Sequence, residues 1–248
     1  MRDVRKSFGG LKALDGVNLR LMPGEILGLV GDNAAGKSTL MKILTGVYHR
    51  DSGEILIDSE SVHFKTPLES RNLGIEMIYQ DFALCGNMDV PMNMFLGRWP
   101  TRGIFLDKKR MVSETKAVLD KLSVDIPSIK LTVDGLSGGR QQSVAIARAI
   151  SFKPKVMILD EPTANLSVPA IARVLDLMRE LKNHNVAQVI ISHRLTDVFS
   201  VADRVMVLKR GSNAGERMVK DTTEEEVLSL IIRGDQNGRV EETQSSAA

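Results

Sequence analysis

The fold of this chain is decided by one stretch, Gly31-Asp32-Asn33-Ala34-Ala35-Gly36-Lys37-Ser38-Thr39. It matches the pattern G-x-x-x-x-G-K-[ST], in which backbone N–H groups wrap a phosphate and the lysine reaches its outer oxygens. The apolar run 25–30 before it is typical of a buried strand, and residues 37–44 after it have helical composition. A helix start adds partial positive charge. The stretch therefore predicts a site for a nucleotide's phosphates, with the Ser38 hydroxyl available to ligate Mg²⁺.

A second motif ends in two carboxylates. The apolar run 156–159 predicts a strand, and Asp160 and Glu161 follow it directly. Such a strand delivers Asp160 to the carboxyl edge of a parallel sheet, where α/β proteins bind ligands. There Asp160 would hold Mg²⁺ through water, and Glu161 would orient or deprotonate an attacking water. Alone, this pattern also fits an ordinary strand end; together with Lys37 it indicates nucleotide hydrolysis.

A third motif is a Ser-Gly-Gly sequence at the start of a helix predicted over residues 137–150. Ser137, Gly138 and Gly139 supply a hydroxyl, two unobstructed N–H groups and the positive end of a helix. An isolated Ser-Gly-Gly is more often a simple helix cap, and the other two motifs favour a second anion site. The chain thus carries two anion-binding helix starts but one set of metal-binding and water-activating residues.

The rest of the chain alternates predicted strands and helices, except in the middle. Further strands are predicted at Glu54–Asp58, Leu73–Tyr79, Val186–Ile191 and Arg204–Leu208, and helices at Pro169–Asn185 and from Thr222 or Thr223 onward. Strand signals fade over residues 82–133, which predicts a mostly helical insert. Its clearest helix is 110–122, with an apolar face offered by Met111, Ala117, Val118, Leu119 and Leu122.

Composition excludes several classes of protein. In 248 residues, 33 Lys and Arg nearly balance 31 Asp and Glu, which argues against a dedicated nucleic-acid binder. A hydrophobic content of 43% argues against disorder. A single cysteine, Cys85, excludes an internal disulfide. No apolar run approaches the roughly 20 residues needed to cross a bilayer. We therefore expect a soluble chain whose membrane role, if any, comes through a partner.

In the order of these motifs the chain resembles the ATP-binding subunit of an ABC transporter, from about Arg5 to Gly211. The resemblance implies an α/β fold with a phosphate-loop ATPase core, a mostly parallel sheet, an antiparallel β part and a helical subdomain. It places the core at residues 1–81 and 134–233 and the helical subdomain at 82–133. The tail at 234–248 is polar with little apolar content, so we expect it to be disordered. The resemblance also implies Mg²⁺-dependent ATP hydrolysis.

The resemblance assigns roles to three more residues. Phe8 falls where the family stacks an aromatic ring on adenine. Gln80 matches the glutamine that touches Mg²⁺ or the attacking water and begins the segment facing the membrane subunit. His193 matches the histidine that contacts the γ-phosphate. The expected catalytic set is then Lys37, Gln80, Glu161 and His193, and the expected metal set is Ser38, Gln80 and Asp160. ATP would contact Phe8, the run 31–39 and, across a dimer, Ser137, Gly138 and Gly139.

The resemblance narrows to the class that imports ribose, xylose, fructose and similar sugars, in its single-cassette form. The stretches that carry it are Gly46–Tyr48, Pro67–Arg71, Leu73–Ile75, Tyr79–Asp81 and Asn93–Arg98. The implied partners are a second copy of the chain, head to tail around two ATP molecules, transmembrane permease subunits and, indirectly, a solute-binding protein. The implied location is the inner face of the cell membrane.

Three departures from the family pattern qualify this expectation. Ala34 stands where a third glycine is usual, and costs on the order of 1–2 kcal/mol if the position needs φ > 0. Ser167 replaces an aspartate used across the dimer interface. The chain also begins abruptly, so part of the first strand is expected to be absent. A regulatory or assembly subunit with weak catalysis, and a soluble ABC ATPase acting on ribosomes or DNA, therefore stay open; an exporter is less favoured.

Overall fold

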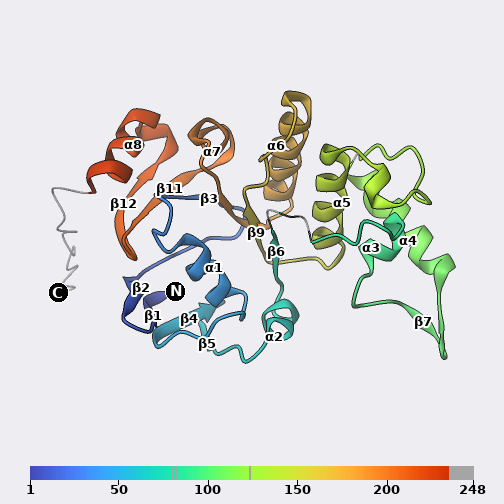
Figure 1. Cartoon of the computed structure of the whole chain (residues 1–248), viewed down its shortest axis with the longest axis horizontal. Coiled ribbons are helices and arrows are strands. Elements are labelled where there is room, and N and C mark those ends of the chain that lie inside the picture. The colour runs from blue at the N-terminus through green and yellow to red at the C-terminus, as the bar shows by residue number, and fades with distance from the viewer. Residues whose placement is uncertain (80, 82, 123, 235–248) are drawn as a thin grey trace, which may run out of the picture.

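A six-stranded sheet forms the centre of the molecule (Figure 1). The computed structural model describes residues 1–79, 81, 83–122 and 124–234. Five strands are parallel, and only the edge strand β12 runs antiparallel to its neighbour. The central strands are continuous apolar runs because helices and a second sheet cover both faces. The sheet order is β12 (Ser212–Met218), β11 (Arg204–Lys209), β3 (Ile26–Val30), β10 (Ala187–Ile191), β9 (Val156–Asp160) and β6 (Ile75–Ile78).

A four-stranded antiparallel sheet packs beside α1 (Lys37–Leu44). Side chains from β1, β2 and β4, including Val4, Leu14 and Ile55, share one buried apolar cluster with Leu40 and Met41 of α1 and with β3. The helix after the phosphate loop is therefore held between the two sheets. The order in this sheet is β2 (Leu11–Val17), β1 (Arg2–Phe8), β4 (Ser52–Ile57) and β5 (Glu60–Val62), and α2 (Pro67–Asn72) leads from it toward β6.

Helices from the second half of the chain bury the other apolar cluster. The stripe predicted for α6 is buried in full: Ile171, Val174, Leu175, Met178 and Leu181. The final helix begins after Thr223, whose hydroxyl and Glu226 form a reciprocal capping box. This arrangement decides between the two starts that the sequence allowed. The helices are α5 (Gly138–Ser151), α6 (Val168–Asn183), α7 (Leu195–Val201) and α8 (Glu224–Arg233), with a short η2 (Val219–Asp221) before α8.

The stretch predicted as mostly helical also contains a small β-hairpin. It holds α3 (Val90–Met94), β7 (Thr101–Arg102), β8 (Phe105–Leu106), α4 (Lys108–Lys121) and η1 (Val133–Gly135). The apolar face predicted for α4 is wrong at Ala117, which is exposed, while Thr115 is buried. The buried positions of α4 follow a four-residue spacing from Met111, and Ala117 falls off that stripe.

The α/β fold class is confirmed, with its mostly parallel sheet and its antiparallel part. Every helix in the described part of the chain is too short or too polar to cross a membrane. Of the tail predicted to be disordered, only Gly234 lies among the described residues.

Candidate functional site

The phosphate loop, residues 31–39, leaves the carboxyl end of β3 and enters α1. Two of its glycines are required by geometry. Gly31 has φ +147°, and a Cβ there would collide with the Leu208 carbonyl. Gly36 has φ +104°, and a Cβ would lie 2.7 Å from the Ala13 carbonyl oxygen. Only glycine combines such angles with such close approach, so these two positions fix the path of the loop.

Lys37 turns back across the loop. Its Nζ donates to the carbonyl oxygens of Gly31 at 2.6 Å and Asp32 at 2.9 Å, and the side chain is buried. Burial lowers the pKa of Lys37, and the carboxylates of Glu161 and Asp160 oppose that shift. A desolvated ammonium held by neutral carbonyls is well suited to bind an anion that enters the loop.

Asp160 and Glu161 lie at the carboxyl end of β9, beside the end of β10. Burial raises the pKa of Asp160, and the positive charges of Lys37 and Lys42 oppose the rise. Burial likewise raises the pKa of Glu161, which His193 opposes. Both carboxylates are therefore partly buried, and a bound cation or proton would offset the cost of burying their charge.

The backbone turns sharply at Glu161, where φ is +50°. Its N–H donates to the Ile191 carbonyl at 2.9 Å, and its Oε1 accepts from the His193 N–H at 3.0 Å. The His193 Nε2 lies 3.4 Å from the same oxygen. The structure thus brings Glu161 and His193 into contact. Asp160 lies at the carboxyl edge of the sheet, where the sequence places it, and the loop that carries Lys37 leaves the same edge.

The residues present fit Mg²⁺ in their chemistry. The Ser38 hydroxyl and the Asp160 carboxylate are hard oxygen donors, and Mg²⁺ bound with a nucleotide commonly takes one or two protein ligands beside phosphate and water. The third expected ligand, Gln80, lies outside the described residues.

Phe8 ends β1 with a half-exposed ring. The Phe8 and Tyr48 rings meet edge to face with their centroids 5.2 Å apart, and the Lys6 Nζ lies 5.4 Å from the Phe8 ring centre. An accessible ring of this kind offers a face to a planar base. Adenine stacking by Phe8 stays a prediction.

The Ser-Gly-Gly motif lies at the start of α5, against α6. Ser137 caps the helix by position, but its hydroxyl makes no cap hydrogen bond. A Cβ on Gly139 would lie 2.7 Å from the Ala170 Cβ, so this glycine allows the two helices to approach closely. A hollow of about 410 Å³ borders the motif and is lined also by Asn165 and Ser167. None of the residues that line this hollow belongs to the phosphate loop, so the hollow does not join the two predicted anion sites.

Two site residues were missed from the sequence. The Thr163 hydroxyl donates to Asp197 Oδ2 at 2.7 Å, and both side chains are buried. The Arg194 Nε lies 3.3 Å from the same oxygen. This tie joins the segment after Glu161 to the helix after His193. No local sequence pattern predicts this contact, because Thr163 and Asp197 are far apart in sequence.

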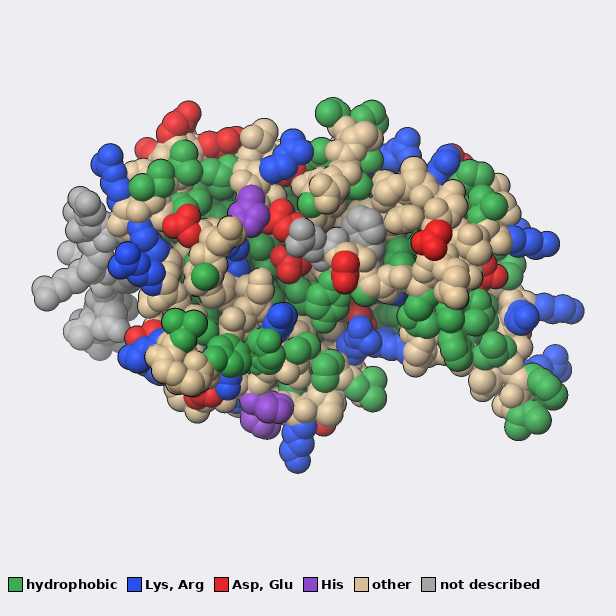
Figure 2. All heavy atoms as spheres, in the orientation of Figure 1, with side chains coloured by type: hydrophobic (Ala, Val, Ile, Leu, Met, Phe, Trp, Pro, Cys, Tyr) green, Lys and Arg blue, Asp and Glu red, His purple; other side chains and the backbone are tan. Residues whose placement is uncertain are grey.

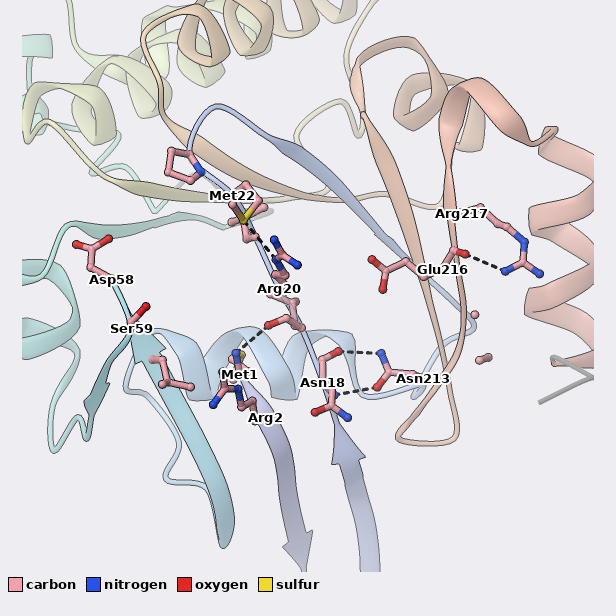
Figure 3. A pocket seen from close by; sticks show the side chains of 16 residues that line it. Met1, Arg2, Asn18, Arg20, Met22, Asp58, Ser59, Asn213, Glu216 and Arg217 are labelled. Atoms are coloured by element: carbon pink, nitrogen blue, oxygen red, sulfur yellow. Dashed lines mark hydrogen bonds between the residues drawn. The ribbon is translucent and has the colours of Figure 1, made fainter. Parts of the chain in front are cut away.

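Another hollow, of about 1090 Å³, lies elsewhere (Figure 3). It is bordered by Met1, Arg20 and the end of β12, and by no residue of the phosphate loop. At its wall Asn18 and Asn213 exchange hydrogen bonds of 2.8 and 2.9 Å, which join the end of β2 to β12. We assign it no part in the site.

The sequence pattern of the ABC transporter family matches residues 14–164. The chain belongs to this family. It is 45% identical to the xylose/arabinose import ATP-binding protein XylG of Sulfolobus acidocaldarius, over 93% of this chain and 92% of that protein. It is 38% identical to the galactose/methyl galactoside import ATP-binding protein MglA of Escherichia coli, over 96% of this chain. The chain spans about half the length of MglA, 47%.

Solved ABC cassettes share the fold. A nucleotide-free ATP-binding cassette from an ABC transporter matches with a TM-score of 0.80 and 27% identity, over 93% of both chains. An ATP-binding cassette of an ABC transporter in its ADP conformation matches with a TM-score of 0.79 and 26% identity, over 94% of this chain and 93% of that one. As an ABC ATPase cassette, the chain binds ATP and is an ATPase.

Proposed function

We propose that this ABC ATPase powers the import of a monosaccharide. The observation that carries the ATPase chemistry is the meeting of Lys37, Asp160, Glu161 and His193 at one edge of the sheet. The sugar class rests on relatives named as sugar import proteins, one of which matches over nearly its whole length. The identity of the sugar is set by other subunits, because they bind it.

Each residue at the edge has a distinct task in this proposal. Lys37 binds the outer phosphate oxygens, and Ser38 and Asp160, with Gln80, hold Mg²⁺, which neutralises phosphate charge when bound. Glu161 orients or deprotonates the water that attacks the γ-phosphate, and His193 contacts that phosphate. The other residues of the phosphate loop and Phe8 contact ATP bound to the same chain. Ser137, Gly138 and Gly139 contact ATP bound to the second copy.

The proposed assembly is a homodimer on a permease. The chain is placed at the inner face of the membrane, with the segment after Gln80 toward the permease and a solute-binding protein acting through it. Residues 1–81 and 134–233 form the ATPase core in this proposal, and residues 82–133 form the helical subdomain.

A pair of substitutions tests the ATPase roles. Glu161→Gln should keep ATP binding and abolish turnover, because the amide fills the same space but cannot take a proton from water. Lys37→Ala should weaken ATP binding itself. The matched control is Glu225→Gln, which makes the same change on the exposed face of α8. Full turnover in Glu161→Gln, or unaltered ATP affinity in Lys37→Ala, would contradict these assignments.

A regulatory subunit with weak catalysis is the second candidate. Ala34, held at φ +62°, and Ser167, in place of the usual aspartate, favour it. Steady-state ATP hydrolysis, with the permease and binding protein reconstituted in vesicles, separates the two candidates. Turnover stimulated by a sugar supports the importer, and a rate no higher than that of Glu161→Gln supports the regulator.

A further inference from the structure

The β7–β8 hairpin exposes large apolar side chains at its tip. Ile104 is 91% exposed and Phe105 is 73% exposed. A Cβ added to Gly103 in the turn would meet nothing within 4 Å, so the tip is open on this side too. Trp99 is 40% exposed just before the hairpin. Adjacent exposed side chains of this size mark an interaction surface more often than scattered single ones do.

The hairpin is a built element that stands away from the body. Thr101 pairs with Leu106 and Arg102 with Phe105, and the Asp107 N–H donates to the Pro100 carbonyl at 2.9 Å to close the base. In Figure 1 it projects at the lower right, along the same edge as α2. In Figure 2 hydrophobic side chains cover this projection, with Lys and Arg side chains nearby.

Positively charged residues lie in the hairpin and at the start of α4, which follows it. Residues 101–114 contain four cations, Arg102, Lys108, Lys109 and Arg110, and two carboxylates, Asp107 and Glu114. One cation is neutralised, since the Arg110 Nε lies 2.6 Å from Glu114. Arg102, Lys108 and Lys109 are exposed and form no ion pair within the part of the chain that the structure describes. The hairpin and the start of α4 therefore combine an apolar tip with a basic rim, since Asp107 offsets only one of these three charges.

The hairpin adjoins the side of the molecule that the proposed function directs toward the membrane. It begins just after Arg98, whose guanidinium lies 4.0 Å from the Phe152 ring centre and 2.9 Å from Glu76. Arg98, Glu76 and Arg71 of α2 line one groove. Tyr79 and Ala83 also line it, and they flank Gln80, where the segment assigned to the permease begins. The location of a membrane near this groove rests on the proposed function.

We infer that the β7–β8 hairpin docks on an anionic phospholipid surface beside the permease. An apolar tip with a tryptophan at its base and lysines around it suits the boundary between acyl chains and headgroups. Anionic headgroups attract such a basic rim. The cytoplasmic loops of membrane proteins carry an excess of Lys and Arg. The basic rim of the hairpin is therefore attracted to anionic lipid and repelled by basic permease loops, so we expect it to contact lipid.

Trp99 is the only tryptophan of the chain and reports directly on docking. The full chain is mixed with vesicles of phosphatidylcholine alone, or of phosphatidylcholine with phosphatidylglycerol. We expect co-sedimentation and a blue shift of Trp99 emission with the anionic vesicles only, both weakened by salt. Ile104→Ser with Phe105→Ser should abolish both signals. Lys108→Glu with Lys109→Glu should weaken binding by roughly tenfold or more.

Two matched pairs keep the test specific. Leu228→Ser with Ile232→Ser removes exposed apolar side chains from α8, and Lys116→Glu with Lys121→Glu reverses two exposed charges farther along α4. Both should bind vesicles like the unaltered chain. The inference is overturned if the unaltered chain binds neither vesicle or if the hairpin variants bind normally. It is also overturned if binding requires permease in the vesicle but not anionic lipid. ATP affinity, measured on the same samples, reports separately on the proposed function.

Discussion

Ala34 has a backbone conformation that is unfavourable for alanine. Its φ of +62° lies in the left-handed region, where a Cβ costs roughly 1–2 kcal/mol. Ala34→Gly should therefore raise the free energy of unfolding by up to about 1 kcal/mol, since glycine's greater freedom in the unfolded chain offsets part of the relief. Urea unfolding measures the gain, and titration with ATP measures any tightening of the loop.

The adjacent residue provides the control. Ala35 is buried and has no positive φ. Ala35→Gly removes a buried methyl group and adds freedom to the unfolded chain, so it should destabilise by about 1 kcal/mol. If both glycine variants shift stability in the same direction, strain at Ala34 is not what distinguishes them.

Glu161 should make stability depend on pH in the direction opposite to most acidic residues. Burial raises its folded-state pKa above the ordinary 4.5, so the folded chain holds this proton to higher pH than the unfolded chain does. Stability then falls as pH rises from 4.5 through the folded-state pKa. Glu161→Gln should accordingly be more stable than the unaltered chain at about pH 7, and the gain should vanish near pH 4.

Urea unfolding at the two pH values checks this sign, with Glu225→Gln as the reference for loss of one exposed charge. A Glu161→Gln variant that is less stable at neutral pH would show that the His193 N–H and Lys37 outweigh burial at this carboxylate.

At the scale of the elements, the hydrogen bond from Thr163 to Asp197 links the segment after β9 to α7. We expect this link to keep Glu161 and His193 close together. Thr163→Val keeps the shape of the side chain but removes the hydroxyl that donates to Asp197, leaving a buried carboxylate with one partner fewer. We expect a loss of about 1–3 kcal/mol in the free energy of unfolding, and a fall in turnover because the two segments can separate.

Thr163→Ser is the matched control, since it retains the donor and should keep most of both properties. Combining Thr163→Val with Asp197→Asn measures the coupling between the two side chains. Strictly additive effects on stability and on turnover would mean that the hydrogen bond does not link the two segments.

The sequence predicted those elements whose apolar pattern is unbroken. The strands ending at Val30, Asp160 and Ile191 are buried apolar runs, and the structure has all three. The phosphate loop was recognisable because its chemistry fixes residue types at fixed spacing. The predicted apolar face of α4 failed at Ala117 because composition alone does not show which stripe meets the core.

Other elements were missed for physical reasons. In β1 only Val4 is fully buried, and charged side chains occupy neighbouring positions, so no run of apolar residues marks the strand. The strand β12 lies at a sheet edge and has largely polar composition. The Thr163–Asp197 contact depends on how two distant segments meet, which no local spacing encodes.

At the scale of the whole molecule, the two helix starts that the sequence predicts to bind anions lie on different parts of the surface. The phosphate loop is fixed by β3, α1 and the antiparallel sheet, whereas Ser137 and its glycines sit where α5 meets α6. The hollow at the second site contains no residue of the phosphate loop and no Asp160 or Glu161. A second copy turned head to tail would supply the missing set, which is why we propose a dimer around two ATP molecules.

Ser137→Arg tests whether the second helix start completes a partner's site. The added guanidinium would enter the hollow that Ser137 borders, which no residue of the same chain's phosphate loop lines. In a Glu161→Gln background, where ATP persists, the chain should dimerise with ATP, and Ser137→Arg should abolish the dimer while the monomer still binds ATP. Light scattering with and without ATP measures this. Ser113→Arg, an exposed change on α4, should leave the dimer intact. Loss of ATP binding by the Ser137→Arg monomer would mean that both helix starts serve one chain's own site.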